Sequence, residues 1–185
     1  MSAQQTLKNL FLDLSKQSLG QLGIGGKREA DYVAEMLADF GTQRVWFPSH
    51  AREAYEFVEL AELMSQQVHA SAGEEPVLLG ERAFRKHVGD LTLFMSGIFR
   101  RFIERHDLLD CYFEAGSRSY ASVWRIDRSL NREDSEIFGE LSRGFERYSG
   151  AIDYMRKCFF AHVPGEDPFS DFLERARKRP AFGPN

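Results

Sequence analysis

Two neighbouring segments of the sequence constrain the fold most strongly. Residues 91–102 read LTLFMSGIFRRF and form the most apolar part of the chain, and residues 111–124 read CYFEAGSRSYASVW and are the richest in small residues. Because a short hinge separates them, we expect two helices that pack together as a hairpin. The first helix is apolar on most sides, which predicts a central position for it in the fold.

Helical spacing of apolar residues extends over most of the remaining chain. The spacing predicts helices over about 7–19, 28–40, 49–70, 77–105, 112–126 and 131–159, with a bend near Gly89 and a short helix after Asp167. Residues 42–48 are the only weakly strand-like segment. The sequence therefore predicts an all-α, single-domain helical bundle of about six or seven helices with a central apolar hairpin.

Loop and cap residues suggest where the bundle begins and ends. Residues 20–27, GQLGIGGK, are too rich in glycine for a helix and predict a linker. Asn131 is expected to cap the last long helix, with Asp134 three residues later. The predicted organisation is an N-terminal helix and glycine-rich linker over 1–27, a bundle core over 28–162, and a short helix and basic C-terminal tail over 163–185.

The overall composition argues against several classes of function. A net charge of −4 provides no global basic field for nucleic acid. The longest apolar run is interrupted by Arg100 and Arg101 before it could span a bilayer, so we expect no membrane segment. Cys111 and Cys158 form no CxxC motif and the N-terminal residues do not resemble a signal peptide, which together indicate a cytoplasmic protein.

The glycine-rich segment also resembles a phosphate-binding loop superficially. A P-loop needs GxxxxGK followed by Ser or Thr, but here Gln21 occupies the first glycine position and Arg28 follows Lys27. The P-loop interpretation therefore fails. A looser anion-binding turn at the start of the next helix stays open beside the simple linker.

Polar residues that border the central hairpin are the candidate site. Asp90 precedes the apolar run, where a carboxylate is either paired in the core or part of a site. The second helix of the hairpin adds further polar side chains near one face. The candidate ligand-binding residues are Asp90, Tyr112, Arg118, Ser119 and Tyr120. These residues suit a pocket floor, but they suit equally a buried network that satisfies Asp90.

Two histidines stand three residues before a carboxylate, a spacing that can place two metal ligands on one helical face. The pairs are His50 with Glu53 and His87 with Asp90. Di-metal helical bundles use Glu-x-x-His, the reverse order, so the pattern is incomplete. His87 and Asp90 form the better candidate metal pair because they lead into the central helix.

The strings VGDLTLFMSGIF and CYFEAGSRSYASV resemble an uncharacterised bacterial family of all-helical proteins. That family is characterised by GDxxLFxxGFF and YxxxGxxSY elements, and the resemblance covers about residues 29–156. This chain departs from the family where Arg100 replaces a proline. The resemblance implies the fold and the importance of the matched positions. It supplies no reaction and leaves the cofactor unknown.

No catalytic motif is recognisable, so the sequence favours a non-catalytic interaction module that binds a protein partner or forms a homo-oligomer. The alternative is a small-ligand or metal site, possibly enzymatic, between the central helices. That alternative would use His87, Asp90, Tyr112 and Tyr120.

Overall fold

The computed structural model describes residues 3–42 and 75–159, and within these ranges it contains seven helices and no strand. The prediction of an all-α bundle is therefore confirmed. The helices are α1 (Ala3–Gln21), α2 (Lys27–Thr42), α4 (Glu75–Ile98), α5 (Arg100–Glu104), α6 (Leu109–Ser129), α7 (Ser135–Arg143) and α8 (Phe145–Phe159). The predicted strand-like segment 42–48 falls almost entirely outside the described ranges, as do the helix from Ser49, the pair His50–Glu53 and the helix after Asp167.

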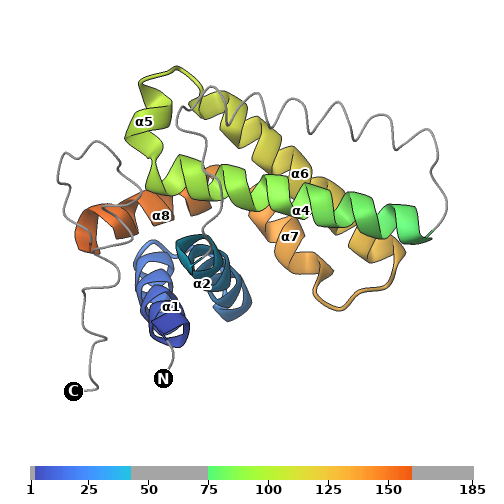
Figure 1. The fold of residues 1–185 in the computed structure, drawn as a ribbon, viewed down its shortest axis with the longest axis horizontal. Coiled ribbons are helices and arrows are strands. Elements are labelled where there is room, and N and C mark those ends of the chain that lie inside the picture. The colour runs from blue at the N-terminus through green and yellow to red at the C-terminus, as the bar shows by residue number, and fades with distance from the viewer. Residues whose placement is uncertain (1–2, 43–74, 160–185) are drawn as a thin grey trace.

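The predicted central hairpin is formed by α4 and α6, which pack against each other along their length (Figure 1). Helix α8 also packs on α4, α7 packs on α6, and the α1–α2 pair lies beneath α4 and α8 in the view of Figure 1. Every residue from Leu91 to Ile98 is buried. The apolar segment is thus enclosed on all sides, as its pattern predicted. No helix in the described part of the chain is both long and apolar enough to cross a membrane.

The glycine-rich segment after α1 forms a hydrogen-bonded turn that connects α1 to α2. The Ile24 amide donates to the Leu19 carbonyl at 2.9 Å and the Gly23 amide donates to the Gly20 carbonyl at 3.2 Å, with Gly23 at φ 62°. This is the Schellman arrangement, which favours glycine at the left-handed position. The Gly26 amide donates to the Glu29 carboxylate at 2.7 Å, so an internal anion already occupies the start of α2.

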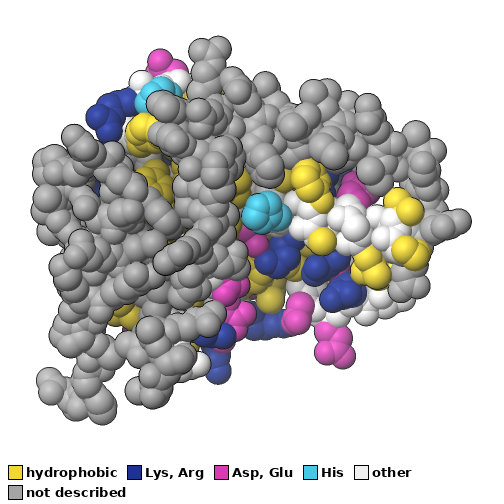
Figure 2. All heavy atoms as spheres, in the orientation of Figure 1, with side chains coloured by type: hydrophobic (Ala, Val, Ile, Leu, Met, Phe, Trp, Pro, Cys, Tyr) yellow, Lys and Arg dark blue, Asp and Glu magenta, His cyan; other side chains and the backbone are white. Residues whose placement is uncertain are grey.

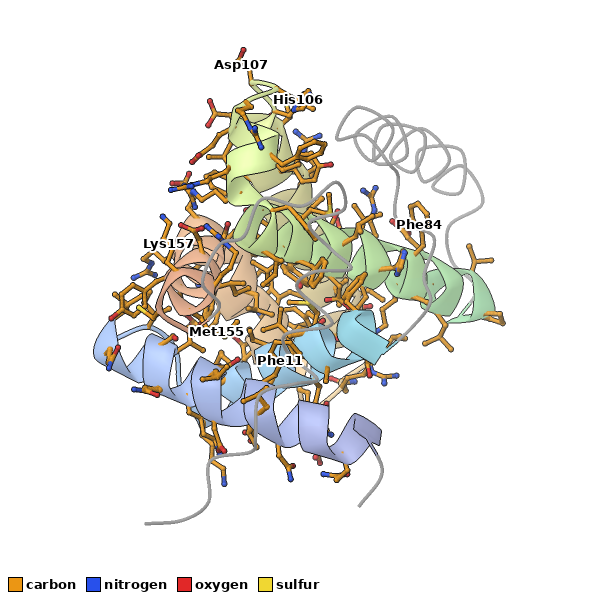
Figure 3. All side chains as sticks on the ribbon, turned by 60° about the vertical axis from the view of Figure 1, so that its left-hand side comes forward. Phe11, Phe84, His106, Asp107, Met155 and Lys157 are labelled. Atoms are coloured by element: carbon orange, nitrogen blue, oxygen red, sulfur yellow. The ribbon has the colours of Figure 1, made fainter. Side chains whose placement is uncertain are left out.

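Helix α1 belongs to the same hydrophobic core as the rest of the bundle. Leu10, Phe11 and Leu14 are buried together with residues of α2, α4 and α8. Figure 3 shows Phe11 on α1 facing the neighbouring helices. The segment 20–27 therefore positions α1 against the bundle.

The end of the central helix was predicted wrongly. The helix was expected to continue to about Arg105, but α4 ends at Ile98 and α5 begins at Arg100. Phe99 adopts φ −104° and ψ 24°, and its carbonyl accepts the amides of both Phe102 and Ile103. The change of direction leaves Ile103 fully buried. Gly89, where a bend was expected, lies within continuous helix.

The last long helix was also predicted wrongly, because it is two helices that meet at Gly144. Asn131 does not cap a helix start. It lies at φ 51° after α6, where the Arg132 amide donates to the Asp127 carbonyl at 2.9 Å, so it closes the preceding helix as Gly23 does. A Cβ on Gly144 would approach the Tyr148 ring at 3.0 Å. Gly144 itself adopts φ −105° and ψ 15°, outside the helical range, where the two helices meet.

Candidate functional site

Asp90 is the centre of a polar cluster that joins three helices. Its side chain is buried in α4, and its Oδ1 atom accepts a hydrogen bond from the Tyr120 hydroxyl of α6 at 2.8 Å. The same oxygen accepts from the Tyr32 hydroxyl of α2. Lys86, one turn earlier in α4, donates to Oδ2 at 2.6 Å. We call these four residues the Asp90 cluster.

A second, partly buried ion pair lies one turn before Lys86 on the same side of α4. Arg82 donates to both carboxylate oxygens of Asp127 in α6, with Nη2 to Oδ2 at 2.9 Å. Arg132 adds a contact to Asp127 at 3.4 Å. The Arg82 guanidinium also lies 5.5 Å from the centre of the Phe138 ring, a favourable cation–π distance. Residues 82, 86 and 90 thus form one polar line along α4.

The chemistry of the two phenols follows from their surroundings. Burial raises the pKa of Tyr120 well above its usual value of 10.0, and the negative charge of Asp90 raises it further. The pKa of Tyr32 is raised by the same two causes. Both phenols therefore remain protonated at neutral pH and act as hydrogen-bond donors to the carboxylate.

Both carboxylate oxygens of Asp90 therefore already accept hydrogen bonds from side chains of the protein. Oδ1 accepts two phenol hydrogen bonds and Oδ2 accepts the Lys86 ammonium. A buried carboxylate with this many donors is satisfied within the chain. The arrangement matches the buried-network alternative, and it leaves little acceptor capacity for a ligand.

The other predicted site residues lie apart from this cluster. Tyr112 is buried in α6, and its pKa is raised by burial alone, without the Asp90 contribution that acts on Tyr32 and Tyr120. Arg118 is exposed and pairs with Glu114 on the surface. The Ser119 hydroxyl is completely buried and has no hydrogen-bond partner among the described residues. The structure brings together only Asp90 and Tyr120 from the predicted ligand-binding set.

The two residues of the candidate metal pair, His87 and Asp90, have different surroundings. His87 is exposed, and its ring stacks on Phe40 with centroids 6.3 Å apart, whereas Asp90 points into the cluster. Within residues 3–42 and 75–159, no group of three or more His, Cys, Asp or Glu side chains is arranged to hold an ion. On the face shown in Figure 2, basic side chains gather near the middle of α4 and hydrophobic side chains gather toward its start.

Sequence reasoning missed Tyr32, Lys86, Arg82 and Asp127. Tyr32 stands at helical spacing with Met36 and Phe40, so the sequence pattern cannot distinguish its phenol from a core ring. The four-residue spacing of Lys86 and Asp90 was a usable signal, because such pairs meet on one helical face. The pairing of Arg82 with Asp127 depends on the packing of α4 on α6, which no local pattern reveals.

Two surface grooves lie near these helices. One, of about 500 Å³, lies between α6 and the junction of α7 with α8, and we call it the α6–α8 groove. It is lined by Asp110, Phe113, Glu114, Ser117, Ser142, Arg143, Gly144, Phe145, Glu146 and Arg147. The other, of about 340 Å³, is lined by Arg28, Asp31, Tyr32, Glu35, Arg82, Asp134, Ile137 and Phe138. Asp90 lines neither groove.

Comparison of the chain with protein-family models, with curated proteins and with solved structures gave no match. The functional interpretation therefore depends on the geometry of the chain itself.

The raised phenol pKa values predict a loss of stability at high pH. An unfolded tyrosine ionises near pH 10, whereas Tyr32 and Tyr120 resist ionisation when folded and the pKa of Tyr148 is raised to about 12. Stability should thus be complete below about pH 10 and fall as the pH rises toward the folded-state values, because only the unfolded chain releases these protons. Denaturant midpoints measured between about pH 8 and pH 11.5 should decline above about pH 10. A constant midpoint over this range would contradict the buried, protonated phenols.

Proposed function

We propose that the protein is a non-catalytic helical module that acts by binding a protein partner or by self-association. The observation that supports this proposal is the internal satisfaction of the Asp90 cluster. Its carboxylate, two phenols and ammonium bond one another, so they serve the folding of α2, α4 and α6. The sequence offers no other set of residues that suggests catalysis. The separate, free cysteines Cys111 and Cys158 support a cytoplasmic location within the same proposal.

The surface that we propose for recognition is the α6–α8 groove. Asp110, Glu146 and Arg147 line it, are exposed, and make no ion pair with any described residue. Charged groups at the rim of an interface chiefly affect partner choice and association rate. The half-buried Phe113 also lines the groove, and aromatic side chains are enriched in protein interfaces.

The alternative, a small-ligand or metal site at His87, Asp90, Tyr112 and Tyr120, has weaker support. It requires a ligand to replace the phenol or ammonium donors of Asp90, and His87 and Tyr112 lie outside the cluster. Elemental analysis of the purified protein tests the metal part of this alternative separately.

Light scattering coupled to size-exclusion chromatography, over a wide range of protein concentration, tests the proposal. We expect either a mass above the 21.2 kDa of one chain, or a monomer that retains a protein partner in pull-down experiments. Arg147→Glu should weaken the association, whereas Arg125→Glu should not, since Arg125 is exposed on α6 outside the groove lining. A strict monomer that retains no partner would contradict the proposal.

A further inference from the structure

The charged side chains that line the α6–α8 groove are divided by sign between its two walls. The α6 wall is a single helical face, formed at i, i+3, i+4 and i+7 spacing by Asp110, Phe113, Glu114 and Ser117. Both charged residues of this wall are acids. The opposite wall, formed by residues 142–147 where α7 meets α8, carries Arg143 and Arg147 and a single acid, Glu146. An acidic wall therefore faces a wall with an excess of positive charge.

Direct contacts hold the two walls of the groove in place. The Ser117 hydroxyl donates to the Ser142 carbonyl, and the Ser142 hydroxyl donates to the Ser117 carbonyl, both at 2.9 Å. The buried Phe145 ring packs against Phe113 with centroids 6.2 Å apart. These contacts fix the α6 wall relative to the α7–α8 wall, so the division of charge is a property of the folded chain.

The opposite charges of the two walls do not pair with each other inside one chain. Glu114 and Arg143 each form an ion pair within their own helix. Asp110 and Arg147 are exposed, and neither forms an ion pair with any described residue. Each wall thus presents a charged group, a carboxylate on α6 and a guanidinium on α8, that is available to a partner.

A second copy of the chain has the charge pattern that complements this groove. When a two-fold axis runs along a groove, each wall of one copy faces the opposite wall of the other. We infer that the α6–α8 groove is a two-fold homodimer interface in which Asp110 of each protomer pairs with Arg147 of its partner. The inference rests on the proposed function and names the partner as a second copy of this chain. Complementary charges of this kind determine partner choice and orientation.

Sedimentation equilibrium of the full chain and of two charge-reversal variants tests the interface. Asp110→Arg and Arg147→Glu each place like charges opposite one another at both symmetry-related contacts, so each should raise the dimer Kd by about tenfold. An equimolar mixture of the two variants should form a heterodimer with a Kd close to that of the wild type. In that heterodimer the introduced arginine faces the introduced glutamate, and the native Asp110 faces the native Arg147.

Arg125→Glu is the control, because Arg125 is exposed on α6 outside the groove lining, and its Kd should equal that of the wild type. Asp110 and Arg147 are also exposed, so circular dichroism should show unchanged helical content in their variants. If the wild type dimerises but the mixture does not recover its Kd, the groove is not the interface, although self-association stands. A wild-type chain that is monomeric and captures a different protein overturns this inference alone. A monomer that captures none contradicts the proposed function as well.

Discussion

Asp90→Ala is expected to destabilise the folded protein by about 3–5 kcal/mol. The substitution removes the carboxylate that accepts from Tyr32 and Tyr120, and it leaves both phenols in the core without this acceptor. Each buried donor that loses its partner costs about 1–3 kcal/mol. Lys86, which is partly exposed, can recover hydration and adds less to the loss.

Equilibrium unfolding in urea measures this effect, with Glu114→Ala as the control. Glu114 also carries an i,i+4 ion pair, with Arg118, but that pair is exposed and should contribute only about 0–1 kcal/mol. A loss for Asp90→Ala no larger than that of the control would show that the cluster contributes little to folding.

Gly116→Ala is the second substitution for which we expect a large effect, of about 2–3 kcal/mol. Gly116 lies where α6 meets both α4 and α8. A Cβ there would stand 2.5 Å from the Thr92 hydroxyl and would overlap the ring of Phe145, which is buried. The buried Phe145 ring and the Thr92 side chain must shift to admit the methyl group, and the packing of α6 on α4 and α8 would loosen.

Gly150→Ala is the matched control for this steric argument. Gly150 is also helical, but a Cβ at that position would meet nothing within 4 Å. Alanine is favoured over glycine in a helix, so this variant should gain about 0.5–1 kcal/mol. Denaturant unfolding of both variants should thus give shifts of opposite sign. A gain in stability for Gly116→Ala would contradict the close packing described here.

The sequence predicted the helices and the central hairpin well because apolar spacing reports directly which helical faces are buried. It predicted less well where helices end. Asn131 suits either a helix start or a left-handed position after a helix, and only the hydrogen bond from Arg132 to Asp127 decides between them. Gly144 likewise sits within one continuous apolar stripe, which continues across the break between α7 and α8.

The candidate site was predicted only in part for a related reason. Asp90 and Tyr120 were identified because both border the hairpin, and Tyr32 was missed because its partner is 58 residues away. Local spacing placed Tyr112 and Ser119 near Tyr120 along α6. It could not show that the carboxylate would be satisfied by a different helix, α2.

A double-mutant cycle between Asp90→Asn and Tyr120→Phe tests most directly whether the Asp90 cluster serves folding. Free energies of unfolding for the wild type, the two single variants and the double variant isolate the interaction between the two side chains. We predict that each single variant is less stable than the wild type, with a favourable coupling of about 1–2 kcal/mol. Replacing a residue that is retained for ligand binding often increases the stability of the fold. A stability of Asp90→Asn equal to or above that of the wild type would therefore contradict the structural role of the cluster.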